Sequence, residues 1–522
     1  MARLKPYHPD QGRLLPVVFD QQIQQGTFEF AVHHLVEEMD LTDVLARFRN
    51  DDTGAPAYDP RALLKVVLVG YSRGILSSRA IERACRENVV FQALSADTRP
   101  HFTTIADFVS SMGGQIRGLF VQILTVCSQE GLISRQMFAV DGCKLSSNAA
   151  KEWSGTTDEI GKRVAKIEQT VELLLRKHRE ADVGEATGMM PSIRQEEGKA
   201  IERLRGKAEK LRAWLASGQE KMGSRGKPRQ SNLTDNESAK MPSSHGVVQG
   251  YNGVAMVDEK RQVIVHAEAF GEGSEQALLK PMIECTRENF KALGEEEDAF
   301  AGSVLVADCG YSSEANAKLV LQDEEIEAYI PDTNFRKRDP AFANASRYRR
   351  SVTRRPLRRG KRYFLPEDFR YDPEKGKLIC PAGKELYVKN RNFVSVDGLR
   401  GIAYEGRKTD CRTCALRPKC LRNAKTEHRQ VVKFALPEAD APKTYLAQMI
   451  ERIDSALGRH LYSRRMGIVE PVFGNIRNAK GMDRFTLRGK AKVDIQWKLY
   501  GMVHNIGKLL KFGPRFAVGA TG

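Results

Sequence analysis

Three acidic residues stand at positions from which their side chains could do chemistry together. Asp141 ends the apolar run 137–141, and Asp308 ends a second apolar run, 303–308. Each run predicts a strand that delivers a carboxylate to its C-terminal end, although an aspartate there is also a common turn former or helix cap. If the two strands are neighbours in one sheet, the two carboxylates lie near each other.

The third acid, Glu470, is followed directly by Pro471. Proline fits the first turn of a helix, so this pair predicts that Glu470 lies at or near a helix N-terminus. The helix dipole stabilises an anion at that position. Arg477 lies seven residues further on, nearly two helical turns away, so it is expected on the same helix face as Glu470.

Three carboxylates gathered over a sheet suit two Mg²⁺ ions, or Mn²⁺ in their place. These cations take hard oxygen ligands and keep positions for water and phosphate. Two such ions about 4 Å apart stabilise both the attacking and the leaving oxygen of an in-line phosphoryl displacement. Phosphodiester chemistry without a covalent enzyme intermediate is therefore expected. Asp235 and Asp258 are competing acids that spacing alone does not exclude.

Four of the nine cysteines form a cluster in the sequence. Cys380 stands in a knuckle-like Cys-Pro-Ala-Gly turn, and Cys411, Cys414 and Cys420 follow in a basic, loop-like segment. Four thiolates satisfy tetrahedral Zn²⁺, and a C-x2-C pair lets one turn supply two ligands. Because only one such pair is present, redox-active or unrelated cysteines stay an open alternative. Cysteines of an unexported chain are expected to be reduced.

The net charge, 83 basic minus 66 acidic residues, is +17, and it is unevenly distributed. Residues 336–362 hold twelve Lys or Arg and one acid, with aromatic residues among or beside them. Guanidinium groups grip phosphate and rings stack on bases, so this segment predicts nucleic-acid contact, with a solvated loop as the alternative. The arginines expected to contact DNA there are Arg349, Arg350, Arg354, Arg355, Arg358 and Arg359.

The N-terminal part of the chain is expected to be helical. Pro60 can begin one helix, Ser77 or Ser78 can cap a second over 79–86, and Thr103 or Thr104 can cap a third. Short, arginine-rich helices with tight connections fit a helix-turn-helix-like DNA reader. The pattern alone favours an ordinary helical bundle.

Later segments alternate between strand and helix patterns. Apolar residues at helical spacing over 164–174 and 201–215 predict an antiparallel helical hairpin inserted between strands. Residues 253–257 and 262–266 predict a β-hairpin, and 328–330 a further strand. A final helix is expected over 493–510.

Taken together, these blocks resemble a bacterial DDE insertion-sequence transposase. The three acidic blocks match in order: Ala-Val-Asp141-Gly, Val-Ala-Asp308-Cys-Gly-Tyr and Glu470-Pro-Val-Phe-Gly-Asn-Ile. The segments that begin at Thr234 and Gly250 resemble the family's linker. The segment that begins at Tyr58 resembles its N-terminal DNA-binding domain, and the segment that begins at Trp497 resembles its terminal helix. The resemblance spans most of the chain.

This resemblance implies an α/β fold, in which an RNase H-like mixed sheet is flanked by helices. Asp141, Asp308 and Glu470 would be its catalytic metal ligands. It further implies Mg²⁺-dependent cleavage at the ends of a mobile element, followed by attack of the freed 3′-OH on target DNA. The implied partners are the terminal inverted repeats, the target DNA and a second copy of the chain.

The family signature Tyr-x2-Arg-x3-Glu-x6-Lys is altered here. The chain has Tyr462-x2-Arg465-x4-Glu470-x6-Arg477, with one extra residue and an arginine in place of lysine. Arginine holds phosphate bidentately, so that replacement keeps the expected phosphate contact. The extra residue leaves open whether Arg464 or Arg465 faces DNA; the expected phosphate contacts are Tyr462, Arg464, Arg465 and Arg477.

Four domains are expected. They are an all-α DNA-binding domain (1–130), a catalytic core (131–334) with the helical hairpin inserted at 151–230, a basic insertion with the cysteine knuckle (335–435), and the final core helices (436–522). No run of about 18 uncharged apolar residues and no apolar signal core is present. The chain is therefore expected to be cytoplasmic and associated with the nucleoid. Two alternative functions stay open, a catalytically inactive DNA-binding relic and a nuclease without strand transfer.

Overall fold

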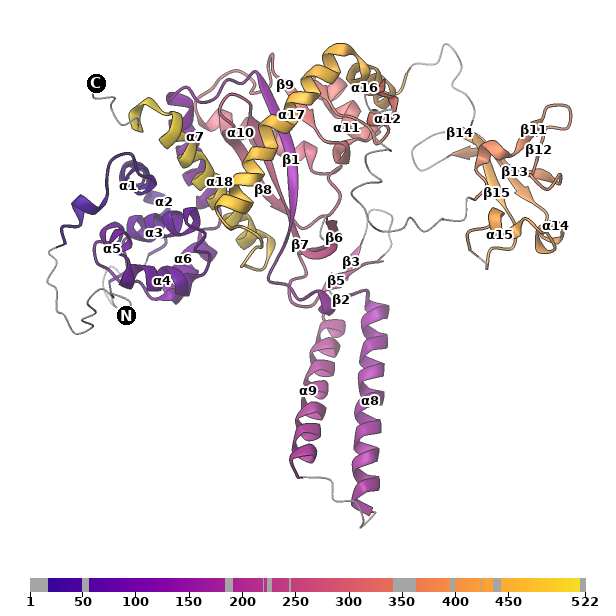
Figure 1. Cartoon of the computed structure of the whole chain (residues 1–522), viewed down its shortest axis with the longest axis horizontal. Coiled ribbons are helices and arrows are strands. Elements are labelled where there is room, and N and C mark those ends of the chain that lie inside the picture. The colour runs from indigo at the N-terminus through magenta and orange to yellow at the C-terminus, as the bar shows by residue number, and fades with distance from the viewer. Residues whose placement is uncertain are drawn as a thin grey trace, which may run out of the picture. The chain divides into compact units, whose positions relative to one another are not determined.

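The computed structural model describes residues 17–48, 56–183, 191–218, 220–222, 228–243, 246–340, 363–394, 400–423, 425–434 and 443–516. The chain forms two compact units (Figure 1). Unit 1 comprises Met1–Pro331 together with Ser455–Gly522, and unit 2 comprises Asp332–Asp454. All three acids of interest belong to unit 1 and the four clustered cysteines belong to unit 2.

The centre of unit 1 is a six-stranded mixed sheet. Its strands are β1 (Met137–Ser146), β6 (Ala239–Ser243), β7 (Gly246–Asp258), β8 (Ile264–Phe270), β9 (Val304–Ala307) and β10 (Glu327–Tyr329). The order is β10-β9-β1-β7-β6, with β8 also paired to β7. Strands β1, β9 and β10 run parallel, whereas β7 is antiparallel to β1, β6 and β8. This mixed α/β architecture is compatible with the expected RNase H-like core.

The central strands are apolar because both of their faces are covered. Met137, Phe138, Ala139 and Val140 of β1 are all buried. Parallel strands of this kind are enriched in apolar residues, since helices cover them on both sides. The apolar runs that predicted two strands at these positions therefore marked the middle of the sheet.

The N-terminal segment is helical, as predicted. Its α-helices are α1 (Phe28–Glu38), α2 (Thr42–Leu45), α3 (Pro60–Ser72), α4 (Ser78–Glu87), α5 (Val89–Leu94), α6 (Phe102–Ser111) and α7 (Gln115–Gln129). Pro60 begins α3 and the Ser77 hydroxyl caps α4, as the sequence indicates. Helix α6 starts earlier than expected, because its N-cap is His101 and not a threonine; the ring nitrogen of His101 accepts the backbone N–H of Thr103.

The last long helix, α18 (Lys490–Phe512), joins the N-terminal helices to the sheet. It packs on β8 and on α1, α3, α6 and α7. The Trp497 indole N–H donates to the carbonyl oxygen of Val254 on β7 at 2.8 Å, and the Tyr500 ring stacks on Tyr71 of α3. The boundary expected after residue 130 thus falls inside unit 1, between α7 and β1.

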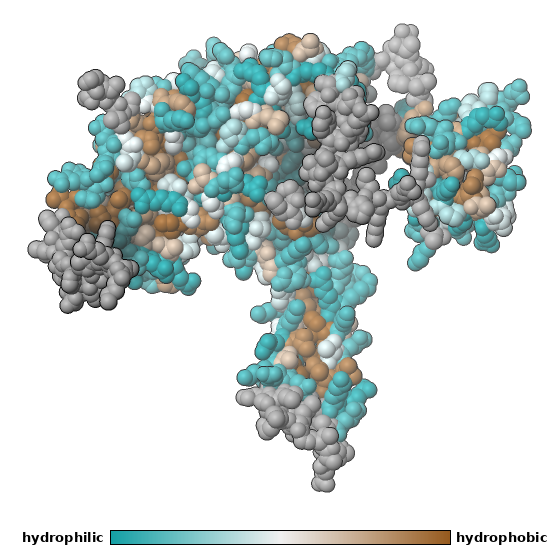
Figure 2. Space-filling view, in the orientation of Figure 1, coloured by the Kyte–Doolittle hydropathy of each residue, from teal (hydrophilic) through white to brown (hydrophobic). Residues whose placement is uncertain are grey.

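The remaining helices of unit 1 surround or extend this core. They are α8 (Thr157–Val183), α9 (Pro191–Ala216), α10 (Leu279–Ala292), α11 (Glu314–Lys318) and α17 (Ala456–Gly474). Helices α8 and α9 form the predicted antiparallel hairpin, whose apolar side chains gather along the facing sides (Figure 2). Ile160, Val164 and Leu211 are buried there. No helix in the described part of the chain has the length and apolar character needed to cross a membrane.

Unit 2 contains a five-stranded antiparallel sheet in the order β11-β12-β13-β14-β15. The strands are β11 (Arg370–Asp372), β12 (Lys377–Ile379), β13 (Glu385–Val394), β14 (Arg400–Gly406) and β15 (Gln430–Phe434). Its helices are α12 (Phe335–Arg338), α14 (Lys408–Arg412), α15 (Arg417–Cys420) and α16 (Tyr445–Asp454). The segment expected to be loop-like around Cys411 to Cys420 is in part helical, since α14 and α15 occupy it.

Candidate functional site

Asp141 lies within strand β1 and not at its end, which corrects the sequence prediction. The strand continues to Ser146, and Asp141 pairs with Ala255 of β7. The continuation is possible because Gly142 leaves room for β7: a Cβ at that position would lie 2.6 Å from the Asn252 side-chain oxygen. A glycine after an apolar run usually marks a turn, whereas Gly142 marks a close approach of two strands.

Asp308 directly follows β9, as predicted. Its carboxylate accepts the Gly310 backbone N–H at 2.6 Å and caps the short 3-10 helix Cys309–Tyr311. The parallel register pairs Val140 with Ala307, the residues immediately before the two aspartates. The register therefore places Asp141 and Asp308 side by side, at adjacent positions of neighbouring strands.

Glu470 lies in the interior of α17, so the prediction that it starts a helix is wrong. Pro471 is tolerated inside this helix although it lacks the N–H that would bond the carbonyl of Gly467. The side-chain amide of Gln262 donates to that carbonyl oxygen at 2.8 Å and replaces the missing backbone bond. Helix α17 packs on β1, β9 and β10, and so carries Glu470 to the sheet.

The three predicted acids line one open cavity of about 630 Å³, together with Arg477 and Glu275. Glu470 shares its helix face with Phe473, three residues on, which also lines the cavity. The three carboxylates are not all within 4.8 Å of one another; among the described residues that condition is met by one group, His266, Glu268 and Cys285. The structure thus brings the three acids to one cavity without forming a closed ligand cage.

Arg465 occupies the position next to Asp141. Its guanidinium donates to the Asp141 carboxylate at 2.6 Å, and both side chains are largely buried. Burial raises the pKa of Asp141 to about 6; the attraction of Arg465 opposes the rise and the neighbouring charge of Asp308 adds to it. A carboxyl group with such a pKa binds a proton readily unless a cation is near.

The helix also resolves which arginine faces the site. Arg465 points to Asp141, whereas Arg464 forms an ion pair with Glu259. The ring of Tyr462 lies near the Arg465 guanidinium, 5.8 Å from its carbon atom. Burial raises the pKa of the Tyr462 phenol, and the charge of Asp308 contributes to this shift. Tyr462 and Arg465 are therefore neighbours of the two aspartates.

Glu275 is a fourth carboxylate of the site, which sequence reasoning missed. It accepts a hydrogen bond from the Asn252 side chain at 3.2 Å and lies 3.3 Å from the Lys144 ammonium. A Cβ at Gly310 would lie 2.1 Å from its Oε2 and 2.8 Å from Asp308 Oδ1. Both carboxylates therefore lie close to the position that a side chain at residue 310 would occupy.

Two buried oxygen atoms near these acids lack a hydrogen-bond partner. They are the Tyr311 hydroxyl and the Asn252 side-chain oxygen. Burial, with the charges of Glu275, Asp141 and Asp308, raises the pKa of the Tyr311 phenol well above its usual value. Buried polar groups are normally satisfied, so these two oxygens are candidates to contact a ligand bound beside the carboxylates.

The competing acids have structural partners elsewhere. Asp258 accepts backbone N–H bonds from Ser134, Arg135 and Lys260 at the ends of β7 and β1. Asp235 accepts the Tyr251 hydroxyl at 2.8 Å. Neither acid lines the cavity that holds Asp141 and Asp308.

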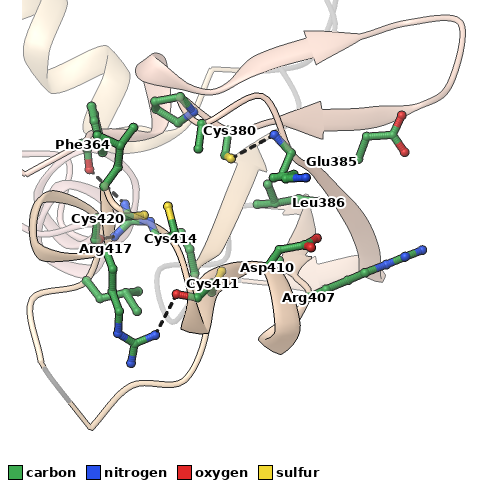
Figure 3. A pocket seen from close by; sticks show the side chains of 17 residues that line it. Phe364, Cys380, Glu385, Leu386, Arg407, Asp410, Cys411, Cys414, Arg417 and Cys420 are labelled. Atoms are coloured by element: carbon green, nitrogen blue, oxygen red, sulfur yellow. Dashed lines mark hydrogen bonds between the residues drawn. The ribbon is translucent and has the colours of Figure 1, made fainter.

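Two other predicted sites belong to unit 2. Cys380, Cys411, Cys414 and Cys420 line a second cavity (Figure 3). The arginines expected to contact DNA, Arg349, Arg350, Arg354, Arg355, Arg358 and Arg359, lie outside the described residues.

The group formed by His266, Glu268 and Cys285 is a weak candidate for a cation. Lys490 lies 3.1 Å from the Glu268 carboxylate, and the charge of Lys498 acts on both His266 and Glu268. Two ammonium groups already neutralise the acid and repel a further cation. We interpret this group as an ion-pair network that fixes α18 to β8.

Two family models match the chain. A transposase DDE domain matches residues 379–510, and a transposase domain, DUF772, matches residues 17–111. The first segment includes Glu470, Arg465 and the four clustered cysteines; Asp141 and Asp308 precede it. The second covers most of the N-terminal helices. A comparison with curated proteins finds no match.

Proposed function

This chain belongs with the bacterial DDE insertion-sequence transposases, and from that premise we propose that it cleaves DNA at the ends of its element and joins the freed 3′-OH to target DNA. Transposases act on DNA, and DDE domains generally use divalent metal ions. The observation that carries the proposal is the convergence of Asp141, Asp308 and Glu470 on one cavity. The strand order β8-β7-β1-β9-β10, three antiparallel strands followed by two parallel ones, supports an RNase H-like core.

The residues present fit a pair of Mg²⁺ ions. All three acids offer hard oxygen ligands, and the Tyr311 hydroxyl beside them is buried without a partner. Asp141 and Asp308 would hold the metals between them, and Glu470 would complete one site. Bound there, the ions would supply the charge stabilisation that an in-line phosphoryl displacement needs.

Basic side chains around the acids would position the DNA backbone. Arg477 lines the cavity with Glu470 and can bind a phosphate bidentately. Arg465, now paired with Asp141, would exchange that carboxylate for phosphate when the cations bind. Tyr462 lies next to Arg465 and Arg464 lies on the same helix; we keep both as proposed backbone contacts.

Other parts of the chain would bind DNA at a distance from the chemistry. We assign element-end binding to the helices of residues 17–111 and further phosphate contacts to the basic segment 336–362. Pairing two element ends requires two active sites, so the working form is proposed to be a homodimer on the nucleoid, in the cytoplasm.

The test uses purified full-length chain, labelled DNA carrying the element ends, and Mg²⁺. Single replacements Asp141→Ala, Asp308→Ala and Glu470→Ala should lower cleavage at least 10³-fold, because each removes charge stabilisation of the transition state. DNA binding, measured by mobility shift without metal, should change little. Asp483→Ala is the matched control, since Asp483 lines the same cavity outside the triad and should keep cleavage.

The outcomes separate the alternatives. Binding without nicking by the wild-type chain would indicate a catalytically inactive relic. Nicking without joined products would indicate a nuclease that lacks strand transfer. Cleavage that survives in Asp308→Ala would refute the assignment of the acids.

A further inference from the structure

The apolar core of the unit 2 sheet is small. Its cluster of buried residues consists of Phe369, Leu378, Leu386, Tyr404 and Val431. Small apolar cores are often supplemented by disulfides, a metal ion or a partner. Cys380 and Cys420 are packed against this cluster, so the thiols stand where a stabilising cross-link would act.

The four clustered cysteines reach one cavity from two separate segments (Figure 3). Cys380 comes from the tight turn between β12 and β13, and the other three come from the stretch that contains α14 and α15. The cavity volume is about 40 Å³, enough for a single ion and too small for an organic cofactor. All nine cysteines are free thiols in the structure.

The turn at Cys380 directs a backbone N–H toward the cysteine sulfur. Gly383 has a φ of +76°, which closes the turn, and its N–H donates to the Cys380 carbonyl at 2.8 Å. The next N–H, that of Lys384, donates to the Cys380 sulfur at 3.3 Å. Backbone donors aimed at a sulfur stabilise its anionic form, which is the form that binds metal.

The charge around the cavity balances that of a metal with four thiolates. Four basic side chains and two acidic ones line it, a net charge of +2; they are Lys384, Arg407, Arg417, Arg429, Glu385 and Asp410. Zn²⁺ with four thiolates carries −2. Arg417 and Arg429 also donate to the carbonyl oxygens of Cys411 and Cys420, and the Arg429 Nε is buried without a partner.

We propose that Cys380, Cys411, Cys414 and Cys420 bind one structural Zn²⁺ that fastens the α14–α15 segment to the β12–β13 turn. Among these four described cysteines, no three sulfur atoms lie within 4.8 Å of one another. A cysteine sulfur moves by rotation about a single dihedral with three staggered positions, so the four can close around an ion without moving the backbone far. The proposal does not depend on the chemistry of the acids in unit 1.

Metal analysis of the full-length chain tests the proposal. After dialysis against a metal-chelating resin, the wild type should retain one zinc per chain, and Cys414→Ser should retain less than a tenth of that. Cys285→Ser is the matched control, because Cys285 belongs to the other cluster of candidate ligand atoms, with His266 and Glu268. It should retain the full zinc content.

A second measurement keeps the test valid if Cys414→Ser misfolds. In the wild-type chain, alkylation mapped by peptide mass spectrometry should spare the four cysteines, and a strong chelator alone should make them reactive. Substitution with Co²⁺ should give the absorption of tetrahedral thiolate coordination. The proposal is overturned by zinc-free protein whose four thiols react at once, by disulfides among them that need a reductant, or by zinc that persists in Cys414→Ser.

Discussion

At the scale of single residues, the central feature is the buried pair of Asp141 and Arg465. The guanidinium gives the buried Asp141 carboxylate a positive partner, a role that a divalent cation would also fill in the proposed mechanism. Even with this partner, burial leaves the charged form of Asp141 disfavoured, with a pKa of about 6. The site is therefore costly to maintain without its cations.

This cost predicts a stabilising substitution. A carboxyl whose pKa rises from 3.8 to about 6 on folding binds more protons in the folded than in the unfolded state between those pH values. Stability is therefore lost as pH rises through that window, and the loss is complete above about pH 7. In metal-free protein, Asp141→Asn should raise the free energy of unfolding by about 3 kcal/mol at pH 7.5 and by less at pH 5.

Urea denaturation in the presence of a chelator, at both pH values, measures this difference. The matched control is Asp483→Asn, an exposed acid of the same cavity. A gap between Asp141→Asn and wild type that does not widen with pH would contradict the assigned shift.

Glu275 is predicted to be a positioning residue. It contacts Lys144 and Asn252 and lies near Asp308 at the Cβ side of Gly310, so it adds negative charge next to the proposed cations. Glu275→Ala should raise the Mg²⁺ concentration needed for half-maximal cleavage about 10-fold or more, because groups behind the metal ligands typically tune affinity by that amount. DNA binding without metal should be unchanged.

A titration of cleavage rate against Mg²⁺ gives this midpoint separately from the maximal rate. Glu275→Gln is the informative second variant, since it keeps an oxygen for the Asn252 amide but removes the charge. If the Mg²⁺ concentration for half-maximal cleavage is unchanged in both variants, Glu275 has only a structural role.

At the scale of elements, α17 contains a backbone carbonyl whose hydrogen bond comes from a side chain outside the helix. Pro471 cannot bond the Gly467 carbonyl, and the Gln262 side chain does so from the turn that precedes β8. The hydrogen bond from Gln262 to the Gly467 carbonyl therefore replaces a missing bond within α17 and also fixes this helix next to the sheet. The π-helical turn Asn475–Ala479 follows directly and contains Arg477, which lines the cavity.

A double-mutant cycle tests the contribution of the hydrogen bond from Gln262 to the Gly467 carbonyl. Gln262→Ala should destabilise the chain more when Pro471 is present than in a Pro471→Ala background, where residue 471 regains its N–H. The expected coupling is about 0.5–1.5 kcal/mol, the net value of one hydrogen bond. Urea denaturation followed by tryptophan fluorescence measures it, and equal effects of Gln262→Ala in both backgrounds would show that the bond contributes nothing.

Sequence reasoning found the elements better than their boundaries. The apolar runs before Asp141 and Asp308 located β1 and β9, because their side chains are buried on both faces. The predictions for the end of β1 and for the position of Glu470 in α17 were wrong. A glycine such as Gly142 usually marks a turn, and a proline such as Pro471 usually marks a helix start. Only distant partners, Asn252 and Gln262, make them compatible with a strand and a helix.

The three acids could be selected from sequence because their motifs stand in a recognisable order, whereas Glu275 carries no local signal. It precedes α10 by a few residues in a polar loop, and nothing nearby marks it as different from other surface glutamates. Glu275 lies at the cavity because the folded chain brings it next to Gly310. No hydrophobic pattern in the sequence predicts this contact.

At the scale of the whole molecule, the net charge of +17 governs how the chain meets DNA. If roughly six to ten phosphates are contacted, affinity should fall about 10³- to 10⁵-fold between roughly 50 and 200 mM salt. Replacing Arg349 and Arg350 together by Ala should lower the slope of log affinity against log salt by about two.

Fluorescence anisotropy with a labelled duplex over a salt series measures this slope. Lys375→Ala is the control, because Lys375 is already paired with Glu385 at 3.1 Å and should leave the slope unchanged. An unaltered slope in the double arginine variant would remove the basic segment from the DNA interface.

The position of α18 between the sheet and the N-terminal helices has a consequence for synthesis in the cell. A ribosome makes Asp141 and Asp308 early, but the helix bearing the third acid, and the one that unites the two halves of unit 1, emerge afterwards. In the proposed mechanism a growing chain therefore lacks its third acid until α17 has been synthesised, and no DNA cleavage is expected before that point.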